Sequence, residues 1–95
     1  MFLVLLRFSR GRSRAGELMA AHRAWIQRGF DDGVFQLVGS IRTELGGVVI
    51  ARDTTRAELE ARVLADPFVV HDVVEAELLE ISPSKADPRL HFLLA

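Results

Sequence analysis

The chain contains 95 residues with a formal net charge of −1, and 49% of its residues are hydrophobic. This composition excludes an intrinsically disordered chain, and the absence of cysteine excludes disulfides, iron–sulfur clusters and a thiol nucleophile. The longest uncharged apolar run, residues 2–6, is too short to cross a membrane and lacks the flanks of a signal peptide. We therefore expect a single domain located in the cytoplasm, without a membrane partner.

Positive charge gathers near the start of the chain. Residues 1–28 hold six arginines against one glutamate, whereas residues 53–95 hold nine acidic against four basic residues. A nucleic-acid interface would combine more basic residues with interleaved aromatic side chains, so nucleic acid is not an expected partner. The basic segment from Arg7 to Arg14 is interpreted as a solvated loop, or alternatively as a rim that attracts an anionic ligand.

The first half of the chain predicts a strand, a helix and two further strands. Residues 2–8 form an apolar run typical of a buried strand. Apolar side chains over residues 13–29 follow i, i+3, i+4, i+7 spacing, which predicts an amphipathic helix, and Ser13 is placed to cap it. Residues 34–41 and 46–53 favour two strands joined by a short polar hairpin.

The second half predicts one more helix and one more strand. Thr55 and Glu58 have the spacing of a capping box, in which side chains and backbone groups satisfy each other reciprocally at a helix start. The helix is expected over residues 55–65, and Pro67 ends it because proline disfavours a helical residue before it. Residues 73–81 favour the last strand.

This order of elements predicts an α+β, ferredoxin-like βαββαβ domain over residues 1–82, with two helices on one face of a four-stranded antiparallel sheet. The strands at 2–8 and 46–53 are apolar on both sides, so we expect a homodimer or higher homo-oligomer that covers the bare face. In the tail, residues 83–95, apolar side chains alternate over 89–94. This alternation favours an added strand or an arm on a partner subunit.

Two polar residues fall on the inward stripes of the predicted helices. His22 is surrounded at i±3 and i±4 by apolar side chains, and Asp66 follows Leu59 and Val63 at i+7 and i+3. Each residue also has a purely structural interpretation. His22 can be a hydrogen-bonded core histidine, and Asp66 can be an acid that closes a turn before proline. Because both helices share one sheet face, the two side chains can instead meet, and the carboxylate then fixes the histidine tautomer and leaves its other nitrogen free as a base.

Several segments together resemble the YCII-related (YciI-like) family over roughly residues 2–82. They are Ala21-His22, Leu37-Val38-Gly39-Ser40, Gly46-Gly47-Val48-Val49-Ile50 and Ala65-Asp66-Pro67-Phe68. The resemblance implies a dimeric α+β barrel of the ferredoxin-like superfamily, which includes muconolactone isomerases and cofactor-free monooxygenases. It also implies an active-site pair at His22 and Asp66, and one branch of the family is similar to a dehydrochlorinase of chlorinated hydroxyquinols. The chain departs from the family at Ser40, where a proline often follows the glycine.

The resulting hypothesis is a small enzyme without cofactor or metal. It would use His22 and Asp66 as a catalytic pair for proton transfer on a small cyclic or aromatic molecule, as a lyase, isomerase or dehydrochlorinase. The residues expected to contact the substrate are Gly39, Ser40, Trp25 and Phe68. The alternatives are a non-catalytic module that binds a small molecule or regulates, and a structural dimer with a vestigial pocket.

Overall fold

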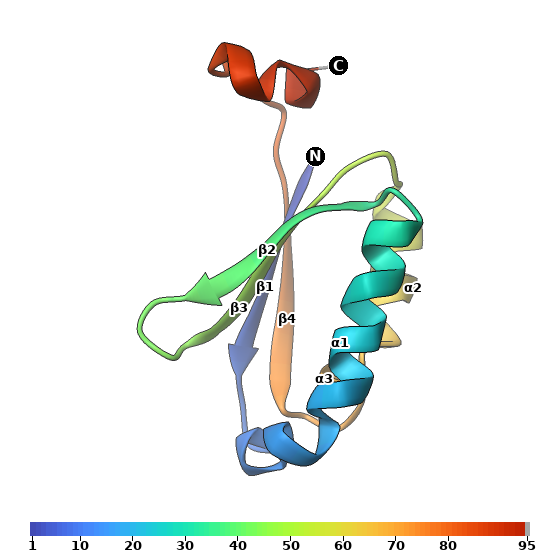
Figure 1. The fold of residues 1–95 in the computed structure, drawn as a ribbon, viewed down its shortest axis with the longest axis vertical. Helices are drawn as coiled ribbons and strands as arrows, with labels where there is room; N and C mark the ends of the chain where they lie inside the picture. Colours follow the sequence, from blue (N-terminus) through green and yellow to red (C-terminus); the bar gives the residue numbers. More distant parts are fainter. Residues whose placement is uncertain (95) are drawn as a thin grey trace.

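A four-stranded antiparallel sheet with helices packed on one face forms the body of the protein in the computed structural model, which describes residues 1–94 (Figure 1). The strands are β1 (Phe2–Phe8), β2 (Phe35–Ile41), β3 (Gly46–Ala51) and β4 (Val74–Glu80), in the spatial order β2-β3-β1-β4. The helical elements are η1 (Arg12–Arg14), α1 (Ala15–Asp31), α2 (Arg56–Leu64), α3 (Pro67–Val70) and η2 (Pro88–Leu94). The predicted ferredoxin-like arrangement is confirmed, and α3 is an addition to it.

Strand β1 lies inside the sheet, between β3 and β4, and its side-chain alternation decides where the core lies. Phe2, Val4 and Leu6 point toward the helices and are buried. They belong to one hydrophobic cluster with Trp25 of α1 and Leu59 of α2. The core therefore fills the layer between the sheet and the helices, as the apolar stripes of the sequence predicted.

Helix α1 begins at Ala15, two residues after the predicted start, and the expected cap at Ser13 is wrong. Ser13 makes no capping hydrogen bond, because it lies inside the 3₁₀ turn η1. The backbone closes that turn itself: the N–H of Arg14 donates to the carbonyl of Gly11 at 2.9 Å. A tight turn that leads directly into a helix supplies backbone partners for the first amides and needs no side-chain cap.

The capping box predicted for the second helix is confirmed. The Thr55 hydroxyl accepts from the backbone N–H of Glu58 at 3.1 Å, and the Glu58 carboxylate accepts from the N–H of Thr55 at 3.2 Å. Helix α2 ends before Asp66-Pro67, as predicted, but proline then opens the one-turn helix α3 as its first residue. Within residues 1–94, no helix has the length and apolar character that crossing a membrane requires.

The tail differs from its predicted strand. Residues 88–94 form the 3₁₀ segment η2, which lies beyond the end of the sheet in Figure 1. Asp87 starts this segment by accepting from the backbone and side chain of Arg89, and these hydrogen bonds hold the pKa of its carboxyl below the ordinary value. The Arg52 guanidinium donates to the carbonyl of Phe92. The tail backbone hydrogen-bonds locally instead: the N–H of Leu90 donates to the carbonyl of Asp87 at 2.8 Å.

The sheet face away from the helices is uncovered in the single chain. The strand register places apolar side chains of all four strands on it: Leu3, Leu5, Leu37, Val48, Ile50 and Leu79. Leu37 is 50% exposed and Leu79 is 41% exposed. Three charged residues share this face, Arg7, Glu75 and Glu77, and Arg7 and Glu77 form an ion pair at 2.6 Å. We call this surface the open face.

Candidate active site

His22 and Asp66 form a buried pair between α1 and the start of α3. The distance between His22 Nδ1 and Asp66 Oδ1 is 2.7 Å. His22 is 9% exposed and Asp66 is fully buried. The contact predicted from the two inward stripes is therefore present. An isolated buried carboxylate would cost several kcal/mol, and the histidine is a partner that reduces this cost.

Asp66 also closes the turn before Pro67, as expected of an acid that precedes a proline. The same Oδ1 atom accepts from the backbone N–H of Phe68 at 3.0 Å, which caps α3. The helix cap thus holds the carboxylate in the orientation that meets His22. A carboxylate only accepts hydrogen bonds, so Nδ1 of His22 is the donor and its Nε2 is left without a proton in the neutral ring.

Aromatic rings fix the plane of the imidazole. The ring of Phe68 stacks on His22 with centroids 3.9 Å apart and an interplanar angle of 3°. Trp25 lies on α1 with its ring centroid 5.8 Å from that of His22, and its indole N–H donates to the Arg62 carbonyl at 2.9 Å. Trp25 is only 2% exposed and is held by its hydrogen bond to α2. Because it packs beside His22, the imidazole ring has little freedom to rotate.

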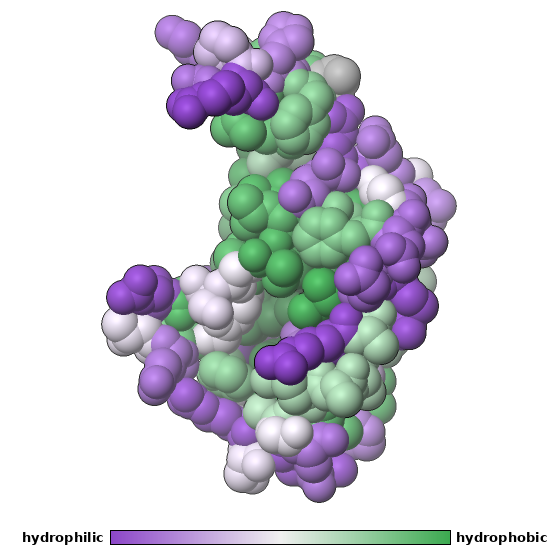
Figure 2. Space-filling view, viewed as in Figure 1, coloured by the Kyte–Doolittle hydropathy of each residue, from purple (hydrophilic) through white to green (hydrophobic). Residues whose placement is uncertain are grey.

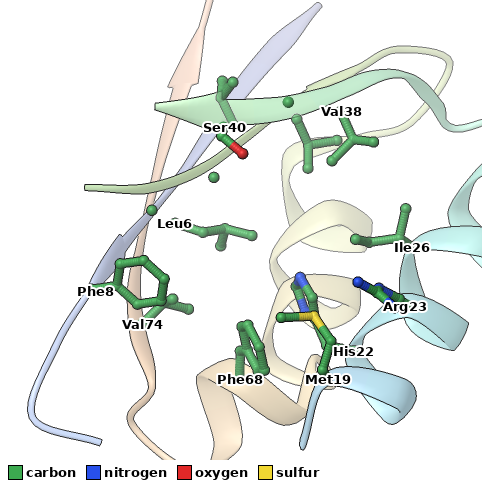
Figure 3. A pocket seen from close by; sticks show the side chains of 15 residues that line it. Leu6, Phe8, Met19, His22, Arg23, Ile26, Val38, Ser40, Phe68 and Val74 are labelled. Carbon is green, nitrogen blue, oxygen red and sulfur yellow. The ribbon is translucent and has the colours of Figure 1, made fainter. Parts of the chain in front are cut away.

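A cavity of about 350 Å³ opens between α1 and the sheet, with His22 in its wall. Most of its lining is apolar, and the polar side chains are His22, Arg23 and Ser40 (Figure 3). The apolar lining side chains come from β1, α1, the hairpin, α3 and β4: Leu6, Phe8, Met19, Ile26, Val38, Val49, Phe68 and Val74. Figure 2 shows apolar surface in the hollow between the β2–β3 hairpin and α1. A mostly apolar cleft with a few convergent polar groups is typical of small-molecule sites.

Glycines of the β2–β3 hairpin make room for this cavity. Gly47 pairs with Leu6, so a side chain at this position would point to the helix side of the sheet, where Gly47 lines the cavity. Gly46 has a φ of +136°, and a Cβ there would lie 2.0 Å from the carbonyl oxygen of Leu6. Only glycine is compatible with that backbone. The sequence indicated a turn at these glycines, and their role in the cavity wall was missed.

The predicted site residues are mostly brought together. Gly39, Ser40 and Phe68 line the cavity with His22, and Figure 3 shows the Ser40 hydroxyl directed into it. Asp66 lies behind the histidine ring and does not reach the cavity wall. Trp25 is in the core and is not among the lining residues, so the structure gives it a supporting position instead of substrate contact.

The basic loop does not enter this cavity. Arg7 pairs with Glu77, and Arg14 pairs with Glu17. Arg12 lies over the ring of Phe8 at 4.3 Å and lines a neighbouring hollow. The arginine that does line the cavity is Arg23, which the sequence analysis did not select because it follows His22 on a helix as an ordinary polar residue.

The residues described here offer no metal site. Across residues 1–94, no group of three or more histidine, aspartate or glutamate side chains is arranged to hold an ion. The buried pair has only two such members, and the carboxylate is already engaged by the α3 amide. The chemistry that this arrangement supports is proton transfer at Nε2 of His22, with a fixed ring and an apolar surrounding.

Comparison with solved structures identifies the same fold in an enzyme. The chain is similar to 5-chloro-2-hydroxyhydroquinone dehydrochlorinase from Burkholderia phenoliruptrix AC1100, solved in complex with 2,5-dihydroxybenzoquinone. The TM-score is 0.68 at 17% sequence identity, and the alignment covers 85% of this chain and 93% of the dehydrochlorinase. No family model matches the sequence, and no curated protein is significantly similar to it. The likeness establishes the α+β ferredoxin-like fold.

Proposed function

We propose that this protein is a small enzyme of the YCII-related type that catalyses proton transfer on a small cyclic or aromatic molecule. The observation that carries the proposal is the buried His22–Asp66 pair at the wall of an apolar cavity of about 350 Å³. Its volume lies at the lower end of the range for small-ligand pockets, which suits a single substituted ring.

In this mechanism His22 is the general base and acid. Its Nε2 removes a proton from a hydroxyl or an activated C–H group of the substrate. The electron pair left behind either expels a leaving group, as in a lyase or dehydrochlorinase, or is protonated at another atom, as in an isomerase. Asp66 keeps Nδ1 as the donor and stabilises the imidazolium that forms, while the Ser40 hydroxyl is available to hydrogen-bond a substrate oxygen.

The shared fold supports a substrate of this kind. The dehydrochlorinase is named for a chlorinated hydroxyhydroquinone and was solved with a dihydroxybenzoquinone, both single oxygenated rings. At 17% identity the likeness does not transfer the reaction itself. Support for a related chemistry in this chain comes from its own histidine, carboxylate and cavity.

We also propose that the working unit is a homodimer formed through the open face. In an antiparallel sheet with one face exposed to water, polar residues are expected to alternate with apolar ones. Here apolar side chains of all four strands occupy most of that face, and the charged side chains on it are Arg7, Glu75 and Glu77. A second copy of the chain, with the same apolar face, would cover it with matching chemistry.

The experiment that tests the enzyme proposal combines binding and turnover. Small hydroxylated aromatic acids, quinones and lactones are screened by thermal shift, and each ligand found is incubated with the protein in D₂O and followed by NMR. We expect proton exchange or conversion with wild type, and a loss of about 100-fold or more in His22→Gln. Arg10→Met, which removes an exposed charge outside the cavity, serves as the control.

Two outcomes would contradict this proposal. Ligand that binds in the cavity without exchange or turnover would favour the binding or regulatory module. Turnover that is unchanged in His22→Gln would separate the activity from the His22–Asp66 pair. A parallel variant, Asp66→Asn, retains an oxygen that can accept from the Phe68 amide but removes the negative charge, so it distinguishes loss of catalysis from loss of the α3 cap.

A further inference from the structure

The wall of the cavity carries charge of one sign. Of its lining residues, His22 and Arg23 alone have ionisable side chains, and none is a carboxylate. Asp66 is fully buried and is not among the lining residues, and its Oδ1 accepts from His22 and from the Phe68 amide. A ligand in the cavity therefore meets a guanidinium with no opposing acid in the same wall.

Arg23 has no ionic partner within residues 1–94. Ion pairs in this part of the chain involve Arg7, Arg12, Arg14, Arg52, Arg56, Arg62 and Arg89. The Arg23 side chain is exposed and lies beside His22 on α1, at the mouth of the cavity (Figure 3). An unpaired guanidinium at the mouth of an apolar cleft is available to bind a ligand anion, because no intramolecular pair must first be broken.

The surface next to the cavity also carries more basic than acidic side chains. A second hollow shares Phe8, Ser40 and Gly46 with the cavity and is lined by two further arginines, Arg12 and Arg42, against one acid, Glu44. The approach to the cavity therefore combines three arginine side chains with one carboxylate. Such an arrangement raises the local concentration of anions and accelerates their binding.

We propose that Arg23 is a specificity-determining residue that binds the carboxylate of a cyclic organic acid, which is the substrate class of the site. This inference rests on the proposed function, since it places the ring of the acid against His22. The guanidinium presents a planar fork of donors that matches a carboxylate in a bidentate manner. Ser40, on the opposite side of the cavity, is then available for a hydroxyl or carbonyl oxygen of the same ligand.

The test compares an acid with its neutral analogue of the same shape. The probes are 2,5-dihydroxybenzoate and 2,5-dihydroxybenzamide, titrated calorimetrically into wild type, Arg23→Met, Arg23→Lys and Arg10→Met. We expect wild type to bind the acid about tenfold more tightly than the amide, as a charge-assisted hydrogen bond allows. In Arg23→Met this preference should disappear with the amide affinity unchanged, and in Arg23→Lys part of it should remain.

Arg10→Met is the matched control, because Arg10 is also exposed but does not line the cavity. It removes the same charge and should keep the tenfold preference. Equal binding of acid and amide by wild type, or a preference that Arg23→Met retains, would overturn the assignment of Arg23 and leave the enzyme proposal standing. Failure of both probes to bind wild type would count against both proposals.

Discussion

A single carboxylate oxygen, Oδ1 of Asp66, links the fold to the candidate chemistry. It accepts from the α3 backbone at Phe68 and from His22, whereas Oδ2 is buried and has no partner within the described chain. The two interpretations of Asp66, a turn-forming acid and a partner of His22, therefore correspond to two hydrogen bonds accepted by the same oxygen. Removing this oxygen affects a helix cap and a histidine together.

This coupling predicts a specific pattern in the free energy of unfolding. His22→Leu and Asp66→Leu should each destabilise by about 1–3 kcal/mol, because each leaves a buried polar partner unsatisfied. The double variant should lose less than the sum, with a coupling energy of roughly 0.5–3 kcal/mol. Urea denaturation of the four proteins measures it.

Asp66→Asn is the control in this cycle. Its amide oxygen can still accept from Phe68, so it should be less destabilised than Asp66→Leu by about the value of a helix cap, ~1 kcal/mol. A coupling energy of zero between His22 and Asp66 would mean that the observed contact contributes nothing to stability.

At the residue level the sequence predicted the pair but missed part of the cavity wall. His22 and Asp66 could be found because helical periodicity fixes which side chains face the sheet. Arg23 and Gly47 could not, since their importance depends on how closely the β2–β3 hairpin approaches α1, a tertiary distance that no local pattern encodes. The position of Trp25 in the core was missed for the same reason.

At the level of elements, turn chemistry decided which predictions held. The Thr55–Glu58 box marked a helix start correctly, because both partners of each hydrogen bond lie within four residues. Ser13 failed as a cap, because the preceding glycine and serine carbonyls already closed a 3₁₀ turn there. The alternation at 89–94 failed to give a strand, because a strand also requires a neighbouring edge.

The β2–β3 hairpin provides a direct test of the cavity. A Cβ on Gly47 would meet nothing closer than the Gly39 carbonyl at 3.4 Å, an ordinary contact, yet it would project into the cavity. Gly47→Val should therefore weaken binding of any cavity ligand at least about tenfold, while changing the unfolding free energy by less than about 1 kcal/mol, since valine is favoured in strands.

Calorimetry with 2,5-dihydroxybenzoate and urea denaturation measure the two quantities for Gly47→Val. Gly16→Ala, on α1, is the control, since no atom lies within 4 Å of the added Cβ. Unchanged affinity in Gly47→Val would place the ligand outside this cavity.

The whole molecule has more surface than a compact monomer of its size. Its accessible surface is 6126 Å², whereas a folded monomer of 10.6 kDa is expected to expose about 5,500 Å². Its radius of gyration is 13.5 Å, against about 12.4 Å expected for its length. The projecting tail and the open face are both surfaces that a second copy could cover.

Dimerisation through the open face is therefore expected at micromolar concentration. Wild type should give twice the monomer mass of 10.6 kDa by light scattering. Leu5→Glu, which adds a second carboxylate opposite Glu77 on the open face, should give the monomer mass, because a buried unpaired carboxylate costs several kcal/mol. Leu64→Glu, at a 68% exposed position on α2, should remain a dimer.

A monomer mass for wild type, or for Leu64→Glu as well as Leu5→Glu, would refute an interface on the open face. The role of the tail as an arm on the partner stays a prediction. It requires that removal of residues 88–95 weakens the dimer, which the same light-scattering measurement can detect.

The stacking of Trp25 near His22 gives the protein an optical sensor of its own site. The chain contains one tryptophan and no tyrosine, so its tryptophan fluorescence comes from a single known position. The centroid of the Trp25 ring lies 5.8 Å from that of the His22 ring. Any event that moves, charges or covers that imidazole changes the electric field and polarity at the indole. The emission spectrum can therefore follow occupancy of the cavity in real time, without a label and without a prior assay for the reaction.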